Sequence, residues 1–268
     1  MSARTPSNFW TKVSNYLQSA LVFVVFVGGW EFVVDFFKVP AIIVPPPLAI
    51  VISFWQSLLA GELGLHLAVT MFEVVMGFAL GAVSGLLLGF SIALSPLAER
   101  LFYPYVVAFQ TVPKVAVAPI VVIWFGYGMS SKVVITAMIA FFPVLANAIV
   151  GLRSAPQDQV EMMLSYTASR WQVFRMVRLP ASLPYIFVGL DVAIVLSVIG
   201  AIVGEFVGAK AGLGFLILQK NFNFDMAGTF VVLIILSVMG IGLHEIVNRI
   251  QRRVVFWVDI AGDRVTGA

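Results

Sequence analysis

The sequence predicts an all-α membrane protein with six transmembrane helices. Of its 268 residues, 61% are hydrophobic and only 11% are charged. The mean hydropathy of +1.04 is far above that of a soluble domain. The apolar residues also gather in long runs, and a spanning helix needs roughly 20 of them in succession. We therefore expect a single membrane domain over residues 1–268, in contact with membrane lipid along its length.

Each of six apolar stretches is long enough to cross a bilayer once. Their approximate bounds are 17–37, 67–95, 101–125, 132–152, 182–208 and 228–248. The first stretch resembles a secretion signal in one respect, because Arg4 and Lys12 precede it. It stays apolar over a full span, however, and no small-residue cleavage site follows it. We expect a retained membrane anchor.

Basic residues are unevenly distributed over the segments between the spans. With a cytoplasmic N-terminus, eleven of the 16 Lys and Arg residues lie in inside segments, four lie outside and Lys114 lies within a span. Loops rich in Lys and Arg remain in the cytoplasm. We predict that both termini are cytoplasmic and that an inside loop of about 153–181 joins spans four and five. The net charge of +3 thus reflects orientation, and no nucleic-acid partner is expected.

The residue types exclude several kinds of site. The chain has no cysteine, so disulfides, thiolate metal sites and iron–sulfur clusters are excluded. The two histidines, His66 and His244, are too far apart in sequence for a local metal motif. We find no nucleophile and base that fit a catalytic constellation. No metal, no cofactor and no enzymatic activity are predicted.

The segment that follows the first span contains several prolines. The stretch Val39–Pro47, "VPAIIVPPP", cannot form regular helix, because proline lacks the donor N–H and favours extended geometry in the residue before it. An amphipathic stretch, "LAIVISFWQSLLAG", comes next. We expect an extended external segment and then a helix that lies along the membrane interface.

The second span carries a glycine at every fourth position. Gly77, Gly81, Gly85 and Gly89 form a groove on a helix, where a second helix can approach closely. The approaching helix belongs either to the same chain or to another subunit, and the sequence leaves both possibilities open. Glu73 continues the four-residue series, so it should face protein or a cavity and not lipid.

Lys114 is predicted near the middle of the third span. A charge at this depth costs roughly 2.5 to 3.5 kcal/mol on insertion scales, so it needs a reason. Pro113 and Pro119 flank it and interrupt helical hydrogen bonding. Broken helix at membrane depth is tolerated where it is buried in protein or lines a water-filled path.

Two carboxylates lie in the fifth span. Asp191 and Glu205 are fourteen residues apart, which places them within about 40° of one helix face and about 21 Å apart along the axis. One interpretation is a translocation path lined by Lys114, Asp191, Glu73 and Glu205. In the other, Lys114 pairs with a carboxylate for structure alone, and Glu205 contacts water at the outer interface. The structural interpretation is favoured for Glu73 and Glu205.

The inside loop contains signals for the start of two helices. Pro156 suits the first turn of a helix, and Asp158 and Glu161 lie near the positive end of its dipole. Ser169 and Gln172 have the spacing of a capping box, which starts a second helix. This second helix is predicted to end before Pro180.

Two interpretations of this loop remain open on the residues alone. Two short helices joined at a bend form a protrusion that a soluble partner can bind. Alternatively, the loop is a well-capped connector that its arginines hold near anionic lipid.

The loop also keeps the spacing of a known motif, which reads Glu-Ala-Ala, three residues, Gly, nine residues and Ile-x-Leu-Pro. The glutamate, leucine and proline match, while the alanines, glycine and isoleucine are replaced; in order, the motif residues are Glu161, Met162, Met163, Thr167, Val177, Leu179 and Pro180. At these residues the chain resembles the permease subunits of binding-protein-dependent ABC importers. The resemblance implies a sharp bend between the two loop helices at Thr167.

The resemblance extends from about residue 66 to the C-terminus. The stretches "VPKVAVAPIVVIWFGYG", "RLPASLPYIFVGL" and "GAIVGEFVGAKAGLG" are similar to the nitrate, sulfonate, taurine and bicarbonate branch of these permeases. Permeases for thiamine-precursor pyrimidines and riboflavin are also similar around "VPKVAVAPIVVIWFG" and "FFPVLANAIVGL". The implied substrate is a small anion or heterocycle, chosen mostly by an external binding protein.

The resemblance implies a non-catalytic permease subunit of the cell inner membrane that works as a homodimer. Its implied partners are two ABC ATPase subunits inside and an extracytoplasmic solute-binding protein outside. The loop would couple the ATPases to the spans through Asp158, Glu161, Met162, Thr167, Ser169, Leu179 and Pro180. Independently, no lysine follows a glycine, so the chain lacks the phosphate-binding motif of such ATPases.

The alternative function is a self-sufficient, proton-coupled secondary transporter that uses the carboxylates within its spans. Internal repeats are common in such transporters. We find no convincing repeat between residues 1–130 and 131–268.

Overall fold

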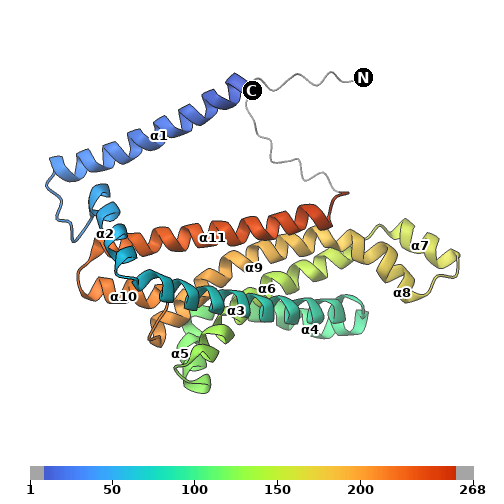
Figure 1. The fold of residues 1–268 in the computed structure, drawn as a ribbon. Coiled ribbons are helices and arrows are strands. Elements are labelled where there is room, and N and C mark those ends of the chain that lie inside the picture. Colours follow the sequence, from blue (N-terminus) through green and yellow to red (C-terminus); the bar gives the residue numbers. More distant parts are fainter. Residues whose placement is uncertain (1–8, 258–268) are drawn as a thin grey trace.

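The computed structural model describes residues 9–257, and in this part of the chain every regular element is a helix (Figure 1). The elements in chain order are α1 (Phe9–Phe36), α2 (Pro47–Leu59), α3 (Glu62–Ala93), α4 (Pro96–Thr111), α5 (Lys114–Phe125), α6 (Met129–Arg153), α7 (Gln157–Ser165), α8 (Arg170–Val173), the π-helical segment η1 (Phe174–Arg178), α9 (Leu179–Gly208), α10 (Leu213–Phe222) and α11 (Met226–Val254).

Helix α6 lies at the centre of the bundle, where it packs along both α3 and α9. Small and β-branched residues allow this close packing: Ala140, Val144 and Ala148 of α6 are fully buried. Helix α11 packs on α9, and α2 packs on α11. The short helices α2 and α10 lie at one end of the bundle, whereas α7 and α8 lie at the other (Figure 1).

Four of the described helices are long and apolar enough to cross a membrane. They are α3, α6, α9 with the segment that leads into it, and α11. They correspond to the second, fourth, fifth and sixth predicted spans. Helix α1 has 28 residues and covers the first predicted span. It contacts the rest of the chain through α2 and through Trp30, whose ring lies 5.8 Å from that of Phe230. The total of six spans stays a prediction.

The third predicted span is not a straight helix. Helices α4 and α5 form a pair whose axes bend by 95° at the break between them. The break falls at Val112 and Pro113, because the proline cannot donate a backbone hydrogen bond and keeps the preceding residue extended. Helix α5 then continues past Pro119 to Phe125. The pair supplies a fifth span only if both helices are counted together.

The prediction that the second loop helix ends before Pro180 is wrong. Helix α8 runs through η1 into α9, which together form one helical stretch from Arg170 to Gly208. The π-helical segment changes the hydrogen-bond register immediately before Pro180. Such a change accommodates a residue without a donor N–H, so the chain remains helical across the proline.

Helix α10, in the segment after the fifth span, was not predicted. It has only 10 residues, and its start carries no Ser, Thr or Asp that would mark an N-cap. Gly212 precedes it with a φ of +120°, a conformation that side-chain-bearing residues rarely adopt. Leu213 and Leu216 are then buried against the spans, so the helix depends on packing that its own sequence does not indicate.

Candidate functional site

Glu73 and Glu205 lie together at the end of the bundle that carries α10. Both are almost completely buried, with exposures of 2% and 1%. Thr70, one turn before Glu73 on α3, donates its hydroxyl hydrogen to Oε1 of Glu205 at 2.6 Å. The backbone N–H groups of Gly214 and Phe215 donate to Oε2 of the same carboxyl group. Glu205 therefore binds the N-terminus of α10, where the helix dipole favours a negative charge.

Two further residues complete this cluster, and the sequence did not single them out as site residues. Lys132, the first residue of the fourth predicted span, is 2% exposed within α6. Its ammonium group donates to the carbonyl oxygens of Tyr127, Gly128 and Gly208 at 2.7 to 3.0 Å. His66 Nδ1 accepts the N–H of Gly212 at 2.9 Å. Thr70 is also part of this cluster and was not predicted. Its position one helical turn before Glu73 was the sequence signal that could have indicated it. No sequence signal indicated Lys132.

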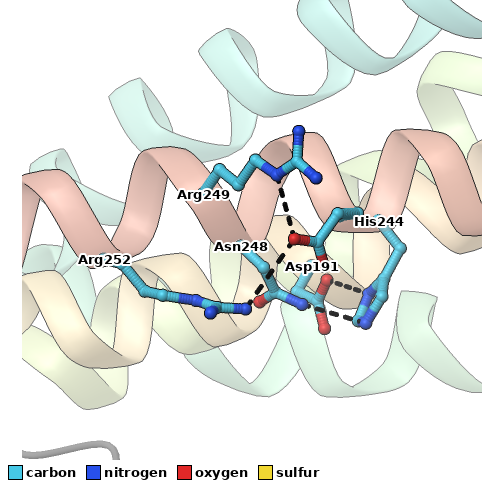
Figure 2. A network of polar contacts seen from close by, with 6 residues as sticks. Asp191, His244, Asn248, Arg249 and Arg252 are labelled. Atoms are coloured by element: carbon cyan, nitrogen blue, oxygen red, sulfur yellow. Dashed lines mark hydrogen bonds and ion pairs between the residues drawn. The ribbon is translucent and has the colours of Figure 1, made fainter.

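Asp191 lies elsewhere on α9 and faces α11. Figure 2 shows His244 pointing toward Asp191, with Nδ1 2.5 Å from the Oδ1 atom of the carboxylate. The side-chain amide of Asn248 lies 2.9 Å from Nε2 of the same ring. If the amide donates to Nε2, Nδ1 carries the proton that faces the carboxylate. Asp191 thus has a specific partner that the sequence spacing could not reveal.

Lys114 contacts neither carboxylate cluster. Its Nζ donates to the carbonyl oxygen of Gln110 at 2.5 Å and lies 4.6 Å from the centre of the Phe142 ring. The first contact bridges the break between α4 and α5, and the second is a cation–π contact with α6. Among the described residues, the ion pair with a carboxylate that we considered for Lys114 is not present. The structure therefore brings Glu73 and Glu205 together and places Lys114 and Asp191 apart from them.

The glycines of α3 pack against α6 within the same chain. A Cβ atom added to Gly77 would lie 2.4 Å from the Thr136 side chain. One added to Gly81 would lie 2.6 Å from the carbonyl oxygen of Ala137. Gly85 and Gly89 likewise leave less than 3 Å for an added Cβ atom. The sequence left open whether the helix that approaches these glycines belongs to the same chain or to another subunit. In the structure it is α6 of the same chain.

The loop between α6 and α9 presents side chains to the outside of the bundle. Val160 is buried against Val173 and Val177, which fixes α7 on the helical stretch that follows. Asp158, Glu161 and Met162 of α7 are exposed. The capping box between Ser169 and Gln172 is present, with both of its hydrogen bonds.

Thr167 makes the bend between α7 and α8. Its φ is +61°, in the left-handed region, where a β-branched residue is an outlier. This is the position at which the loop motif has glycine. The bend is therefore kept at a cost in backbone strain, which is of order 1–3 kcal/mol for such residues.

We expect Thr167→Gly to stabilise the protein by about 1 kcal/mol, because glycine adopts this φ without the strain caused by a Cβ atom. Glycine also raises the conformational entropy of the unfolded chain, which offsets part of this gain. Thermal unfolding of the purified protein measures the change. Ser165→Gly is the matched control, since it places glycine at the last residue of α7 and should destabilise by at most about 0.5 kcal/mol. A lower melting temperature for Thr167→Gly would show that the bend is not strained.

Residues 81–256 match the family described as "Binding-protein-dependent transport system inner membrane component". The chain belongs to this family. It is thus an ABC importer permease of the inner membrane, and the resemblance stated from the sequence is confirmed. Members are transport subunits without catalytic activity of their own.

Curated relatives support the same assignment over most of the chain. The riboflavin transport system permease protein RibX of Chloroflexus aurantiacus is 37% identical and covers 85% of each chain. The formylaminopyrimidine transport permease protein ThiX of Halalkalibacterium halodurans is 35% identical over 90% of this chain and 96% of its own. A putative aliphatic sulfonates transport permease protein, SsuC of Bacillus subtilis, is 30% identical over 90% and 88%.

Among solved structures, a chain of the inward-facing MetNI methionine ABC transporter is similar with a TM-score of 0.58. It is 23% identical, and the match covers 74% of this permease and 96% of that chain. At this identity the similarity concerns the fold alone.

Proposed function

We propose that this permease forms the translocation path of an ATP-driven importer as a homodimer, with two ABC ATPase subunits inside and a solute-binding protein outside. Both termini and the α7–α8 loop then lie in the cytoplasm. The single observation that carries the proposal is the exposed α7, placed at the opposite end of the bundle from α2 and α10 (Figure 1). Met162, Leu164 and Tyr166 are each more than half exposed there. Exposed apolar side chains gathered on a polar loop mark an interaction site.

The bend between α4 and α5 supports the homodimer and the path. Broken helix at membrane depth is tolerated only where protein covers it or water reaches it. Thr111, Val112 and Pro113 are exposed in the single chain. A second copy of the permease supplies the missing cover, and a path between the copies supplies water. Lys114, which follows the break directly, then lines this path.

For the solute we propose a small anion or a small heterocycle. The relatives are named for riboflavin, formylaminopyrimidine and aliphatic sulfonates, which supports both chemical classes as cargo. Beside the break, Lys114 offers a cation for an anionic group, and the neighbouring Phe142 ring offers an aromatic face for a heterocycle.

The experiment is purification of the tagged permease in mild detergent from its native membrane, followed by mass spectrometry of the proteins that accompany it. We expect an ABC ATPase in roughly equal amount. Met162→Asp should reduce its recovery, whereas Asp35→Ala at the opposite end should not. Recovery of the permease alone, together with solute uptake driven by a proton gradient in vesicles, would overturn the proposal in favour of a secondary transporter.

A further inference from the structure

A cavity lies at the end of the bundle that carries α7 and α8 (Figure 1). Its volume is about 550 Å³, which falls within the roughly 300–1,000 Å³ of pockets that bind small molecules. Three segments line it: the end of α3, the helix α7, and the stretch from α8 into η1. The proposed function assigns no ligand to this cavity.

The wall of the cavity is apolar and built from packed side chains. Phe174 is 9% exposed, and its ring lies 6.0 Å from that of Phe90 on α3 and 5.4 Å from that of Trp171. These ring contacts join α3 to the stretch from α8 into η1. Leu94 and Trp171 also line the cavity, yet they are 44% and 66% exposed. An exposed apolar wall with a polar rim marks a place where an apolar group from outside the chain binds.

Two arginines supply the charge in this cavity. Arg170 and Arg178 line it, and none of the described carboxylate residues does. Together with Phe174 they recur at every fourth position, so they share one face of the helical stretch. Neither arginine forms an ion pair with another described residue. Their guanidinium groups are therefore free to bind an anion, and arginine binds phosphate through two parallel hydrogen bonds.

The cavity lies where a span leaves the bilayer. Helix α3 has 32 residues and is long and apolar enough to cross a membrane. Its length is about 48 Å, compared with about 30 Å for the hydrocarbon core and about 40–45 Å when the headgroup layers are included. The end of α3 at Ala93 thus reaches the headgroup layer, where tryptophan is enriched. Basic pockets between membrane helices at this level bind anionic headgroups.

We propose that this cavity binds an anionic phospholipid, with its phosphate group on Arg170 and Arg178 and the first part of an acyl chain on Leu94 and the Trp171 ring. The rest of the lipid lies in the bilayer beside α3. Inorganic phosphate would satisfy the arginines but leave the apolar wall uncovered. A zwitterionic lipid would bring its own cation toward the two arginines. The site belongs to this chain alone and requires neither the proposed partners nor the proposed orientation.

The test measures lipid binding by the full-length permease, purified in detergent and freed of its native lipid. Phosphatidylglycerol and phosphatidylcholine are added in turn, and native mass spectrometry counts the lipids bound per chain. We expect wild type to bind phosphatidylglycerol about tenfold more tightly than phosphatidylcholine, and to melt several degrees higher when it is added. The double variant Arg170→Gln with Arg178→Gln should lose both the preference and the rise in melting temperature.

The matched control combines Arg175→Gln with Arg253→Gln. It removes the same number of positive charges from exposed positions that do not line the cavity, so it should keep the preference. Leu94→Gln tests the apolar wall with both arginines in place, and it should weaken the binding of phosphatidylglycerol. This second variant keeps the test decisive if the double arginine variant does not fold.

Equal binding of the two lipids by wild type would overturn the proposal, as would an unchanged preference in the folded cavity variants. The same rise in melting temperature with inorganic phosphate alone would show that the cavity binds a free anion and not a lipid. Loss of the ATPase from the double arginine variant, without any lipid preference in wild type, would assign the arginines to the docking surface instead. Because lipid binding is measured on the permease alone, failure of the importer proposal would leave this result unchanged.

Discussion

Gly81→Val is expected to prevent the permease from accumulating as a folded protein. The added Cβ atom would lie 2.6 Å from the Ala137 carbonyl oxygen, which is part of the α6 backbone, and 2.9 Å from the Ala140 Cβ atom, which is attached directly to that backbone. Neither can move without displacing the central helix. Overpacking of a core costs typically 1–3 kcal/mol where side chains can adjust. Here the obstacle is backbone, so we expect a loss at or above the top of that range.

Gly64 provides the matched control on the same helix. Nothing lies within 4 Å of a Cβ atom added there. Gly64→Ala should therefore stabilise α3 by about 1 kcal/mol through helix propensity, whereas Gly81→Ala should destabilise in spite of the same gain. Size-exclusion profiles of a fluorescent fusion, and melting temperatures of the purified variants, measure both effects. Equal behaviour of the two alanine variants would mean that α3 and α6 are not in close contact.

The second large effect is expected at α7. Combining Glu161→Ala with Met162→Asp should lower association with the ATPase by roughly tenfold or more, which corresponds to about 1.4 kcal/mol of binding energy. Both side chains are exposed, and Met162 is 53% exposed, so the folded permease gains nothing from them. Buried apolar anchors dominate the energy of interfaces, and a charge at such an anchor removes it.

The measurement for this variant is ATPase recovery per folded permease, together with its melting temperature. Glu245→Ala is the control, because Glu245 is a partly exposed glutamate whose ion pairs, to Arg249 and Arg252, are local to α11. We expect unchanged melting and full recovery for the control. An unchanged recovery for the α7 double variant would assign the docking surface to another part of the chain. A lowered melting temperature would assign these residues to the fold instead.

The spans were predictable from sequence because a bilayer demands long apolar helices, and the residues that satisfy this demand are adjacent in the chain. The glycine series on α3 was predictable for the same reason, since a helix repeats its face every fourth residue. The break at Pro113 was also visible, because proline acts on its own neighbours. The size of the bend was not, since the angle of 95° depends on how α5 packs against α6 and α9.

The polar partners could not be predicted, because they join residues far apart in the chain. Asp191 and His244 are 53 positions apart, and Thr70 and Glu205 are separated by 135. Helical spacing placed Asp191 and Glu205 on similar faces of α9 but could not show that one meets α11 and the other meets α10. The helix across Pro180 was missed for a different reason. Sequence rules assume α-helical register, and a π-helical segment changes that register.

The position of α7 has a mechanical consequence. This short helix is attached on one side to the end of α6 and on the other, through α8 and η1, to the start of α9. Those two helices are packed along each other, and the glycines of α3 lock a third onto them. A force applied to α7 thus acts on the ends of both α6 and α9, which move together because they are packed along each other. The permease should respond by tilting as a block, with compliance concentrated at the joint between α4 and α5 and in the loosely attached α1.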